Sequence, residues 1–261
     1  MRKNMLLLCA MIALSLFFTL LVFAAPSPQS APSPQAAVAS PSVRTLLPIT
    51  TKTTPDQWEF LLDPDRDYVG TLVNLDNPYD FEGDYARMLV TDLTYLPDEV
   101  YLDTACAEQA AAFAFSLLRV RLKQQGIDIG LLGSTAGYRT AEDQDWIYSI
   151  TEDQVKVTAG YSEHHTGLVL SIVFLAADEN GEIVWQTPTA DHFQTAHPDL
   201  IEALLEELPE CGFIVRYPEG KEGITGISAT YRDIRFVGDS DVARFIQLND
   251  LCLEEYLDIA Q

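Results

Sequence analysis

Ser162, Glu163 and His164 stand together in a short polar segment that runs through Gly167 into the apolar, β-branched run 168–172. A polar turn followed by such a run is typical of a loop that presents its side chains at the end of a strand. The imidazole of His164 is a side chain that can bind a metal ion or transfer a proton near neutral pH. The segment therefore predicts a histidine at the mouth of a sheet.

A second polar segment follows the short apolar run 127–132, which we predict to be a strand. Gly137 permits a tight backbone in this segment. The planar guanidinium of Arg139 can bind a carboxylate through two parallel hydrogen bonds. Arginine is scarce in this chain, so its position in a loop after a strand indicates a binding role. The alternative is that Arg139 pairs with a neighbouring acid such as Asp143 or Asp145.

Together these segments resemble the VanY-type D-alanyl-D-alanine carboxypeptidases. That family has a Ser-Gly-Tyr-Arg-Ser element followed by a Gln, and here Ala136–Thr140 and Gln144 are similar to it. Its Ser-x-His turn, with Thr-Gly and an apolar stretch behind it, is similar to Ser162–Gly167. Its Gly-Phe-x-x-Arg-Tyr-Pro and Arg-Tyr-Val-Gly motifs resemble residues 212–218 and 235–238. The resemblance extends over most of the chain beyond its N-terminal segments.

The resemblance implies a zinc site built from His, Asp and a second His, with a Glu that takes the proton from metal-bound water. Carried over by position, the three ligand positions hold His164, Ser171 and Asp233, and the position of the Glu holds Thr230. A serine hydroxyl is not among the usual zinc ligands, and a threonine hydroxyl is no base near neutral pH. We therefore expect no cofactor and no catalytic base. A zinc ion held by His164 and Asp233 is the alternative.

The substrate-binding side of the resemblance is better preserved. It implies four substrate-binding residues, which are Tyr138, Arg139, Gln144 and Ser162. An arginine fork facing a cleft suits the C-terminal carboxylate of a peptidoglycan stem peptide that ends in D-Ala. The resemblance thus implies a protein that retains the binding residues and has lost part of the catalytic set.

Other chemistry is less well supported by the sequence. In an extended segment His165 would point away from His164, and His192 and His197 are typical of surface histidines. No Gly-x-Ser-x-Gly elbow is present for a serine nucleophile. A pair of acids, Glu163 and Asp233, could serve a glycosidase-like reaction only at the right separation, which the sequence does not give.

The elements that must position these residues mix helices and hairpins without a run of βαβ units. We expect strands at 68–75 and 127–132, and a hairpin of 168–177 with 182–186 around Asn180-Gly181. We expect helices at 105–125 and 198–208. The first should be capped by Asp103 or Thr104. It should bury a stripe of apolar residues, namely Ala110, Phe113, Ala114, Leu117 and Val120. The resemblance implies an α+β fold, a small and mainly antiparallel sheet with helices packed on one side.

The charge balance of the chain limits its partners. Lys and Arg number 16 against 39 Asp and Glu, which gives a net charge of −23. A polyanion of this strength is repelled by nucleic acid, so we expect no nucleic-acid partner. No Cys-x-x-Cys pair is present. A disulfide among Cys106, Cys211 and Cys252 and three buried thiols are the two alternatives, and the oligomeric state is left open.

The N-terminal part of the chain predicts export. Two basic residues precede the uncharged run 5–25, which is long enough for a signal-anchor helix at 1–25, with a cleaved signal peptide as the alternative. Residues 26–53 are rich in Pro, Ser and Ala and predict an extended tether. The folded domain should then occupy 54–261, on the outer face of the cytoplasmic membrane, or secreted if the leader is cleaved.

Three functions remain open from the sequence. The first is an inactive D-alanyl-D-alanine carboxypeptidase-like protein of peptidoglycan metabolism that binds a stem-peptide or other peptide C-terminus. The second is an active zinc D,D-carboxypeptidase with altered ligands. The third is a structural or protein-interaction module at the cell surface. Whether the chain is an enzyme depends on how Ser171, Thr230 and Asp233 are arranged.

Overall fold

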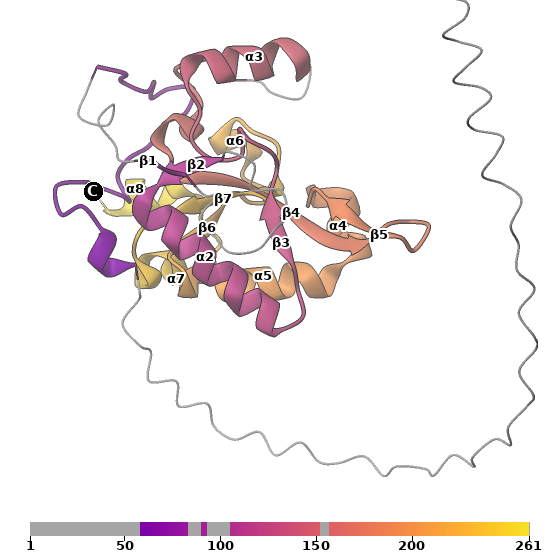
Figure 1. Ribbon diagram of the computed structural model, residues 1–261. Coiled ribbons are helices and arrows are strands. Elements are labelled where there is room, and N and C mark those ends of the chain that lie inside the picture. Colours follow the sequence, from indigo (N-terminus) through magenta and orange to yellow (C-terminus); the bar gives the residue numbers. More distant parts are fainter. Residues whose placement is uncertain (1–57, 83–89, 93–104, 152–156, 261) are drawn as a thin grey trace, which may run out of the picture. The chain divides into compact units, whose positions relative to one another are not determined.

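A computed structural model describes residues 58–82, 90–92, 105–151 and 157–260 (Figure 1). The predicted signal or anchor segment and the tether lie outside these ranges and stay predictions. Asp103 and Thr104, which we expected to cap the first helix, also lie outside them, but that helix begins at Gln109 and its cap is Glu108. In the part of the chain that is described, no helix combines the length and the apolar character needed to cross a bilayer. The unit that carries the site falls within residues 51–261.

The described elements alternate between short strands and helices. The strands are β1 (Val90–Asp92), β2 (Cys106–Glu108), β3 (Ile129–Leu131), β4 (Val169–Ala177), β5 (Ile183–Gln186), β6 (Phe213–Tyr217) and β7 (Thr230–Phe236). The α-helices are α2 (Gln109–Gln124), α3 (Ala141–Thr151), α4 (Ala190–Ala196), α5 (Pro198–Glu210), α6 (Glu222–Thr225), α7 (Ser240–Leu248) and α8 (Leu253–Ala260). Two short 3-10 helices, η1 (Glu59–Leu61) and η4 (Glu163–Thr166), complete the set.

A five-stranded antiparallel sheet forms the centre of the fold. Its main path is β3-β4-β7-β6, and β5 pairs with the far half of β4. β4 is the longest described strand and pairs with three others, so it is the element through which the site and the sheet are connected. The register places Ser171 opposite Asp233 and Val169 opposite Arg235. A separate two-stranded ladder joins β1 to β2.

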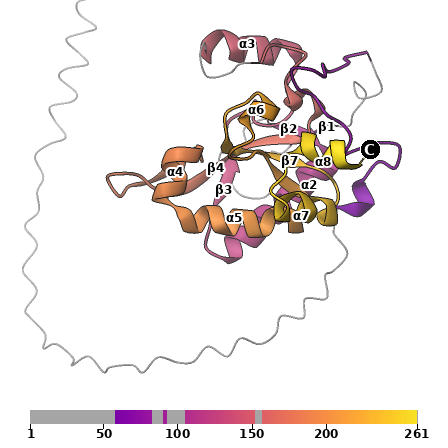
Figure 2. The same ribbon diagram turned by 180° about the vertical axis from the view of Figure 1, so that it is seen from behind.

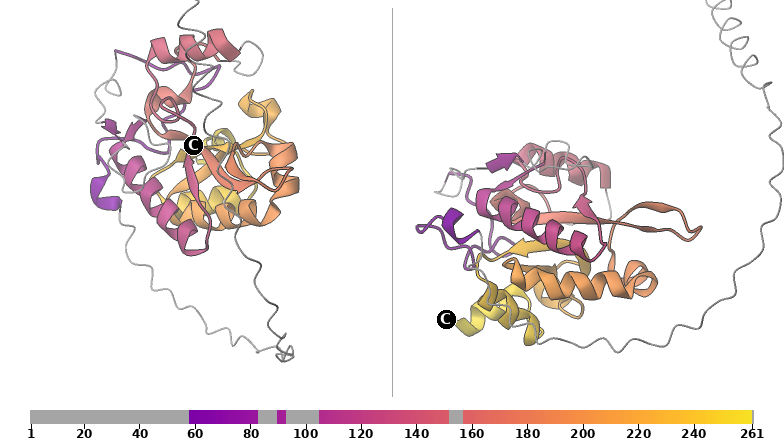
Figure 3. Two further views of the ribbon diagram at one scale, coloured as in Figure 1. Left: turned by 45° about the vertical axis from the view of Figure 1, so that its right-hand side comes forward. Right: turned by 60° about the horizontal axis from the view of Figure 1, so that its bottom comes forward.

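Helices α2 and α5 cover one face of the sheet (Figures 1 and 3). Their apolar side chains pack with Leu170, Ile172, Ile234 and Phe236 in the main core. Because side chains alternate along a strand, Ser171 and its partners on β7 face the opposite side of the sheet. Helix α3 lies at the top of Figure 1, away from α5 at the bottom. The site therefore lies on the face that α2 and α5 leave open.

A smaller cluster of apolar side chains holds the C-terminal helices. Ala243 and Ile246 of α7 and Leu253 of α8 pack with Ile214 of β6 and with Val237. α7 also lies along α5, as Figure 2 shows from behind. This cluster fixes α8 close to β6, which matters for the site because α8 carries Glu254.

The predicted hairpin and the predicted second helix are confirmed. β4 and β5 pair in antiparallel register on either side of Asn180-Gly181, and Gly181 adopts a positive φ of 81°. The predicted helix at 198–208 is α5. The predicted strand at 127–132 is confirmed in its middle as β3. The α+β class and the antiparallel sheet with helices on one side agree with the sequence analysis.

Two of the predicted elements are wrong in whole or in part. Residues 68–75 form turns instead of a strand, because the carbonyls of Tyr68 and Thr71 accept hydrogen bonds from the Arg235 side chain instead of a neighbouring strand. The predicted helix at 105–125 begins at Gln109, because residues 106–108 pair with β1. The carboxylate of Glu108 caps this helix by accepting the backbone N–H of Ala111.

The predicted apolar stripe of this helix is shifted. Phe113 and Val120, which we expected in the core, are 37% and 53% exposed. Ala110 and Ala114 are buried as predicted and Leu117 is partly buried, but the larger buried side chains, Phe115, Leu118 and Leu122, lie on a neighbouring face. The segment is rich in alanine, and alanines fit either face, so the hydrophobic periodicity left the choice of face open.

Candidate functional site

The His164 ring is fixed by the turn that the sequence predicted. Residues 163–166 form η4, and Gly167 ends it in the left-handed region with φ 69° before β4 begins. The ring nitrogen Nδ1 lies 2.8 Å from the carbonyl oxygen of Gly137. Burial, reinforced by the charge of Arg139, lowers the pKa of His164 to about 3. The ring is therefore neutral at pH 7, donates from Nδ1 to Gly137, and turns the lone pair of Nε2 towards Ser171.

Three hydrogen bonds tie the Arg139 loop to the histidine turn. The first is the bond between Gly137 and His164. In the second, the backbone N–H of Arg139 donates to the carbonyl of His164 at 3.3 Å. In the third, Nδ1 of His165 donates to the carbonyl of Arg139 at 2.7 Å. Nε2 of His165 accepts the N–H of Gly160 at 3.0 Å. The two segments that sequence reasoning singled out are thus one structural unit.

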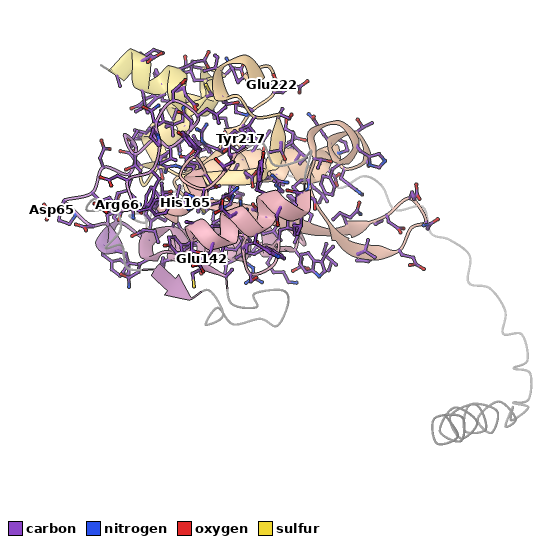
Figure 4. The ribbon with its side chains drawn as sticks, turned by 90° about the horizontal axis from the view of Figure 1, so that it is seen from above. Asp65, Arg66, Glu142, His165, Tyr217 and Glu222 are labelled. Carbon is purple, nitrogen blue, oxygen red and sulfur yellow. The ribbon has the colours of Figure 1, made fainter. Side chains whose placement is uncertain are left out.

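His165 is not the outward-facing residue of an extended segment that we predicted. It lies in η4, is fully buried, and packs against the rings of Tyr79 and Phe81. Both of its ring nitrogens are used in hydrogen bonds, so it holds the loop and offers no lone pair to a ligand. Figure 4 places His165 and Tyr217 towards the middle of the folded unit, whereas Asp65 lies at its edge.

Ser171 and Asp233 meet across the β4–β7 pair, as their positions in the register require. The Ser171 hydroxyl donates to Oδ1 of Asp233 at 2.5 Å and lies 3.4 Å from Nε2 of His164. Nε2 of His164 is 3.9 Å from Oδ1 of Asp233. All three side chains are buried. The three ligand positions therefore converge on one point, where Ser171 donates to Asp233 and the Nε2 lone pair of His164 faces the Ser171 oxygen.

Arg232 completes this group from the residue next to Asp233. Its Nε lies 3.2 Å from both carboxylate oxygens of Asp233, and its Nη2 donates to Oδ2 at 2.8 Å. Burial alone would raise the pKa of Asp233, but the charge and hydrogen bonds of Arg232, with smaller contributions from His164 and Ser171, hold it at about 2. Asp233 is thus an anion whose counter-ion is a guanidinium from its own chain.

Thr230, at the position of the catalytic base, is turned to the backbone. Its hydroxyl faces the carbonyl oxygen of Pro188 at 3.4 Å and accepts the N–H of Arg232 at 3.0 Å. A hydroxyl held in this way has no means of taking a proton from water near neutral pH. The structure therefore gives Thr230 a structural role at the start of β7.

Arg139 reaches the same region from the other side. Its Nε donates to the carbonyl of Thr135 at 2.7 Å, and its Nη1 donates to Oε1 of Gln144 at 3.2 Å. The alternative pairing with Asp143 or Asp145 is not formed, because Asp143 binds Thr140 instead. Burial lowers the pKa of Arg139 to about 10, partly offset by the charge of Asp233, so the side chain stays positive at pH 7.

The other predicted binding residues have different environments. Gln144 is fully buried and donates from Nε2 to the carbonyl of Val157 at 2.8 Å, so it positions Arg139. Ser162 is buried at the entry to η4, and its side chain makes no capping hydrogen bond there. Tyr138 is half-buried, and its backbone N–H donates to the carbonyl of Cys106 at 2.6 Å.

A buried chain of charges beneath the turn was missed by sequence reasoning. Glu163 accepts from Nε of Arg235 at 2.5 Å and from Nε of Arg216, and all three side chains are fully buried. Arg216 in turn donates from Nη1 and Nη2 to Glu254 of α8 at 3.0 and 2.7 Å. The sequence signal for this network is an arginine within each of two apolar strands, Arg216 and Arg235. The sequence analysis used both only as motif positions and predicted no ion pair for them.

The donor set at this point does not fit a zinc ion. A catalytic zinc needs about three strong protein ligands, and only one imidazole and one carboxylate converge here, the latter already paired with Arg232. Within the described ranges, no group of three or more His, Cys, Asp or Glu side chains is arranged to hold a metal. His192 is exposed and His197 lies against the ring of Phe193. No disulfide joins Cys106, Cys211 and Cys252.

Comparison with protein families gives a match over the part of the chain that forms this site. The family model for VanY, described as D-alanyl-D-alanine carboxypeptidase, matches residues 104–239. That range includes Arg139, His164, Ser171, Thr230 and Asp233. It amounts to slightly more than half of the chain.

Two curated relatives from enterococci are similar to the chain. One is the bifunctional D-Ala-D-Ala dipeptidase and D-Ala-D-Ala carboxypeptidase VanXYC of Enterococcus gallinarum, 35% identical over 131 residues. This match covers 47% of the chain and 64% of the relative, less than two thirds of its length. The other is a D-alanyl-D-alanine carboxypeptidase of Enterococcus faecalis, 29% identical, with 89% of the chain and 78% of the relative covered.

Among solved structures, VanYB in complex with D-alanine-D-alanine is similar in fold. The TM-score is 0.55 at 24% sequence identity, with 74% of this chain and 99% of that chain covered. The LdcB LD-carboxypeptidase gives a TM-score of 0.56, also at 24% identity, over 73% of this chain and 86% of that one. At these identities the likeness establishes the fold.

Proposed function

The chain belongs to the VanY family of D-alanyl-D-alanine carboxypeptidases, and on that premise we propose that it binds a peptide C-terminus without hydrolysing it. The observation that carries the proposal is that Ser171 and Arg232 both donate to the Asp233 carboxylate, beside the ring of His164. The Arg232 guanidinium and the Ser171 hydroxyl both donate hydrogen bonds to the Asp233 carboxylate, whereas the family's zinc site would require that position to be free to bind the metal. Without a bound dication and a base, water is not activated for attack on an amide.

The part of the site that recognises a peptide is retained. Arg139 is held by Thr135 and Gln144 through two of its three nitrogens, so its fork is pre-oriented before a ligand arrives. The cation is partly buried, where a hydrogen bond to a carboxylate is stronger than at the surface. A relative of this fold was solved with D-alanine-D-alanine. We therefore assign to this site a peptide that ends in D-Ala, of the kind found in peptidoglycan.

Calorimetric titration with zinc tests the metal-free part of the proposal. We expect no binding at one equivalent and no release of D-Ala from a peptide that ends in D-Ala-D-Ala, with or without added zinc. Tight binding of one zinc per chain, together with D-Ala release that a chelator abolishes, would make the protein an active zinc D,D-carboxypeptidase instead.

Peptide titration tests the binding part. Wild type should bind a peptide with a free C-terminal carboxylate, and Arg139→Ala should weaken this at least tenfold through loss of a charge-assisted bond. Arg139→Lys is the matched control, since it keeps the charge but not the fork, and should lie between the two. If the peptide bound equally to all three proteins, or to none, a structural or protein-interaction module at the cell surface would be the better explanation.

We also propose that the domain works outside the cytoplasmic membrane, held there by its N-terminal segment. The support is the uncharged run 5–25 behind two basic residues and the Pro- and Ser-rich residues after it. A reporter fused after residue 261 should be active only if it is an exported type. The protein should stay with the membrane fraction after a carbonate wash if the leader is an anchor, and be released if it is cleaved.

A further inference from the structure

Each of the two arginines at the site, Arg139 and Arg232, has one terminal nitrogen that can still bind a ligand. Arg139 uses Nε and Nη1, and Arg232 uses Nε and Nη2, in the hydrogen bonds given above. Within the described part of the chain, no hydrogen-bond partner is present for Nη2 of Arg139 or for Nη1 of Arg232. The Arg232 side chain is 35% exposed, so a ligand can reach it.

The two guanidinium groups act on the same small region. The backbone N–H of Arg139 donates to the carbonyl of His164 at 3.3 Å, and the Asp233 carboxylate that Arg232 binds lies 3.9 Å from Nε2 of the same histidine. The charged side chains named at this point are two guanidiniums, Arg139 and Arg232, and the single carboxylate of Asp233. A surplus positive charge in a chain of net charge −23 marks this point as an anion site.

We propose that this site prefers a peptide that has already lost its terminal D-Ala, because Arg232 lies on Asp233 at the ligand positions and its exposed guanidinium can bind the new carboxylate where a metalloenzyme would hold the carbonyl of the bond to be cut. The inference rests on the proposed function and adds which peptide the site selects. It makes the protein a receptor for the product of a D,D-carboxypeptidase reaction, carried out by another protein.

The preference follows from the chemistry of the two groups. A metal ion polarises a neutral carbonyl, and a zinc site is therefore matched to an intact amide. A guanidinium gains most from a full negative charge, because the attraction between opposite charges adds to the hydrogen bond. The carbonyl of an uncut peptide offers Arg232 only a neutral acceptor. The trimmed peptide offers a carboxylate at that position.

The experiment compares two acylated peptides by calorimetry, one ending in L-Lys-D-Ala and one ending in L-Lys-D-Ala-D-Ala. We expect wild type to bind the shorter peptide about tenfold or more tightly than the longer one, and to bind the C-terminal amide of the shorter peptide poorly. Arg232→Gln should abolish the preference. Arg244→Gln, which removes the same charge from the surface of α7, should keep it.

A second variant guards against misfolding. Arg232→Gln alone leaves the buried Asp233 without its counter-ion, so R232Q/D233N is the stable alternative, and it keeps the net charge of the site unchanged. The preference should still be lost in the double variant. If the double variant retained it, net charge and not the guanidinium would select the ligand, and the inference would be overturned.

The outcomes separate this inference from the proposed function. If wild type bound both peptides with equal affinity and Arg139→Ala weakened both, the protein would still be a peptide-binding protein but not a receptor for the trimmed peptide. Tighter binding of the longer peptide would also overturn the inference. If neither peptide bound, the proposed function itself would fail.

Discussion

Four residues decide whether this site can hold a metal, and they lie next to one another in space. Ser171, Thr230, Arg232 and Asp233 occupy neighbouring positions on β4 and β7, and each of them makes a hydrogen bond within the protein. Because the bonds are mutual, changing one residue leaves another without its partner. The altered site is therefore a coupled unit and not a set of independent losses.

Restoring the family's ligands and base, together with removal of the Arg232 guanidinium, should restore a metal site. We expect the variant S171D/T230E/R232Q/D233H to bind one zinc per chain with a dissociation constant below about 1 μM. The backbone that positions them is that of the family fold, so the new ligands should converge with His164. Calorimetry and metal analysis after dialysis measure the result.

The control for this gain is the single change S171D. It places a second carboxylate against Asp233 while Arg232 remains, so it should lower the free energy of unfolding without creating a strong zinc site. Equal zinc affinity in the single and quadruple variants would show that Arg232 does not exclude the metal.

At the scale of elements, the contact between the Arg139 loop and β2 leaves no room for a side chain at Gly137. A Cβ there would overlap the carbonyl oxygen of Cys106, whose partner is the N–H of Tyr138. Gly137→Ala should therefore lower the free energy of unfolding by roughly 1–3 kcal/mol and weaken peptide binding, because the same loop orients His164 and Arg139. Urea unfolding and calorimetry measure both effects.

Gly223→Ala is the matched control for Gly137→Ala. Gly223 lies in α6, and a Cβ added there meets nothing within 4 Å. The change should be neutral or should stabilise by about 0.4–1 kcal/mol. A loss of stability as large as that of Gly137→Ala would mean that the clash with Cys106 is not the cause.

Helix α8 is coupled to the site through the bidentate pair of Glu254 and Arg216. Glu254→Gln should lower the free energy of unfolding at pH 7 by about 3 kcal/mol, since it leaves a buried arginine short of counter-charge. Glu255→Gln, next in sequence, removes the charge from a partly exposed pair with Lys221 and keeps an oxygen that can accept the N–H of Cys252, so it should cost less than about 1 kcal/mol.

The effect of Glu254→Gln should depend on pH in one direction. Burial alone would raise the pKa of Glu254, but the charge and hydrogen bonds of Arg216 hold it below its ordinary value of 4.5. Its ionic contribution is therefore fully present above pH 4.5 and is lost as the pH falls through the lowered pKa. Unfolding curves of wild type and variant should approach each other below pH 4, and a constant difference would contradict this assignment.

The sequence predicts the elements whose signals are local and misses those set by distant partners. The hairpin of β4 and β5 follows from Asn180-Gly181, and α5 follows from its apolar periodicity. The strand expected at 68–75 fails because the backbone there is satisfied by Arg235, more than 160 residues away in sequence. No pattern within residues 68–75 contains that information.

The same distinction applies to the site. Motif positions identify His164, Ser171, Asp233 and Arg139, and the structure brings them together. The pairing of Asp233 with Arg232 depends on side-chain direction at the start of β7, which alternation along a strand does not give. Likewise, the role of Gln144 as a support for Arg139 depends on how α3 begins, and sequence reasoning had assigned it to the ligand.

At the scale of the whole molecule, a small positive site lies in a strongly acidic chain. An anionic peptide is repelled at long range and attracted only near the site, and salt screens the long-range part more effectively. The association rate of such a peptide should therefore rise between about 20 and 150 mM salt, which stopped-flow fluorescence can measure. A rate that falls with salt would show that the local positive charge extends further than the structure indicates.

The buried network of charges that ends at Glu254 also has a consequence for folding during synthesis. A ribosome delivers β6, with Arg216, well before it delivers α8, so the emerging polypeptide holds an arginine whose final neutralising group has not yet been synthesised. If β6 were buried before α8 is available, Arg216 would be a buried cation without its pair to Glu254. Helix α8 is thus expected to pack onto β6 in a late step of folding, after residue 254 has left the exit tunnel.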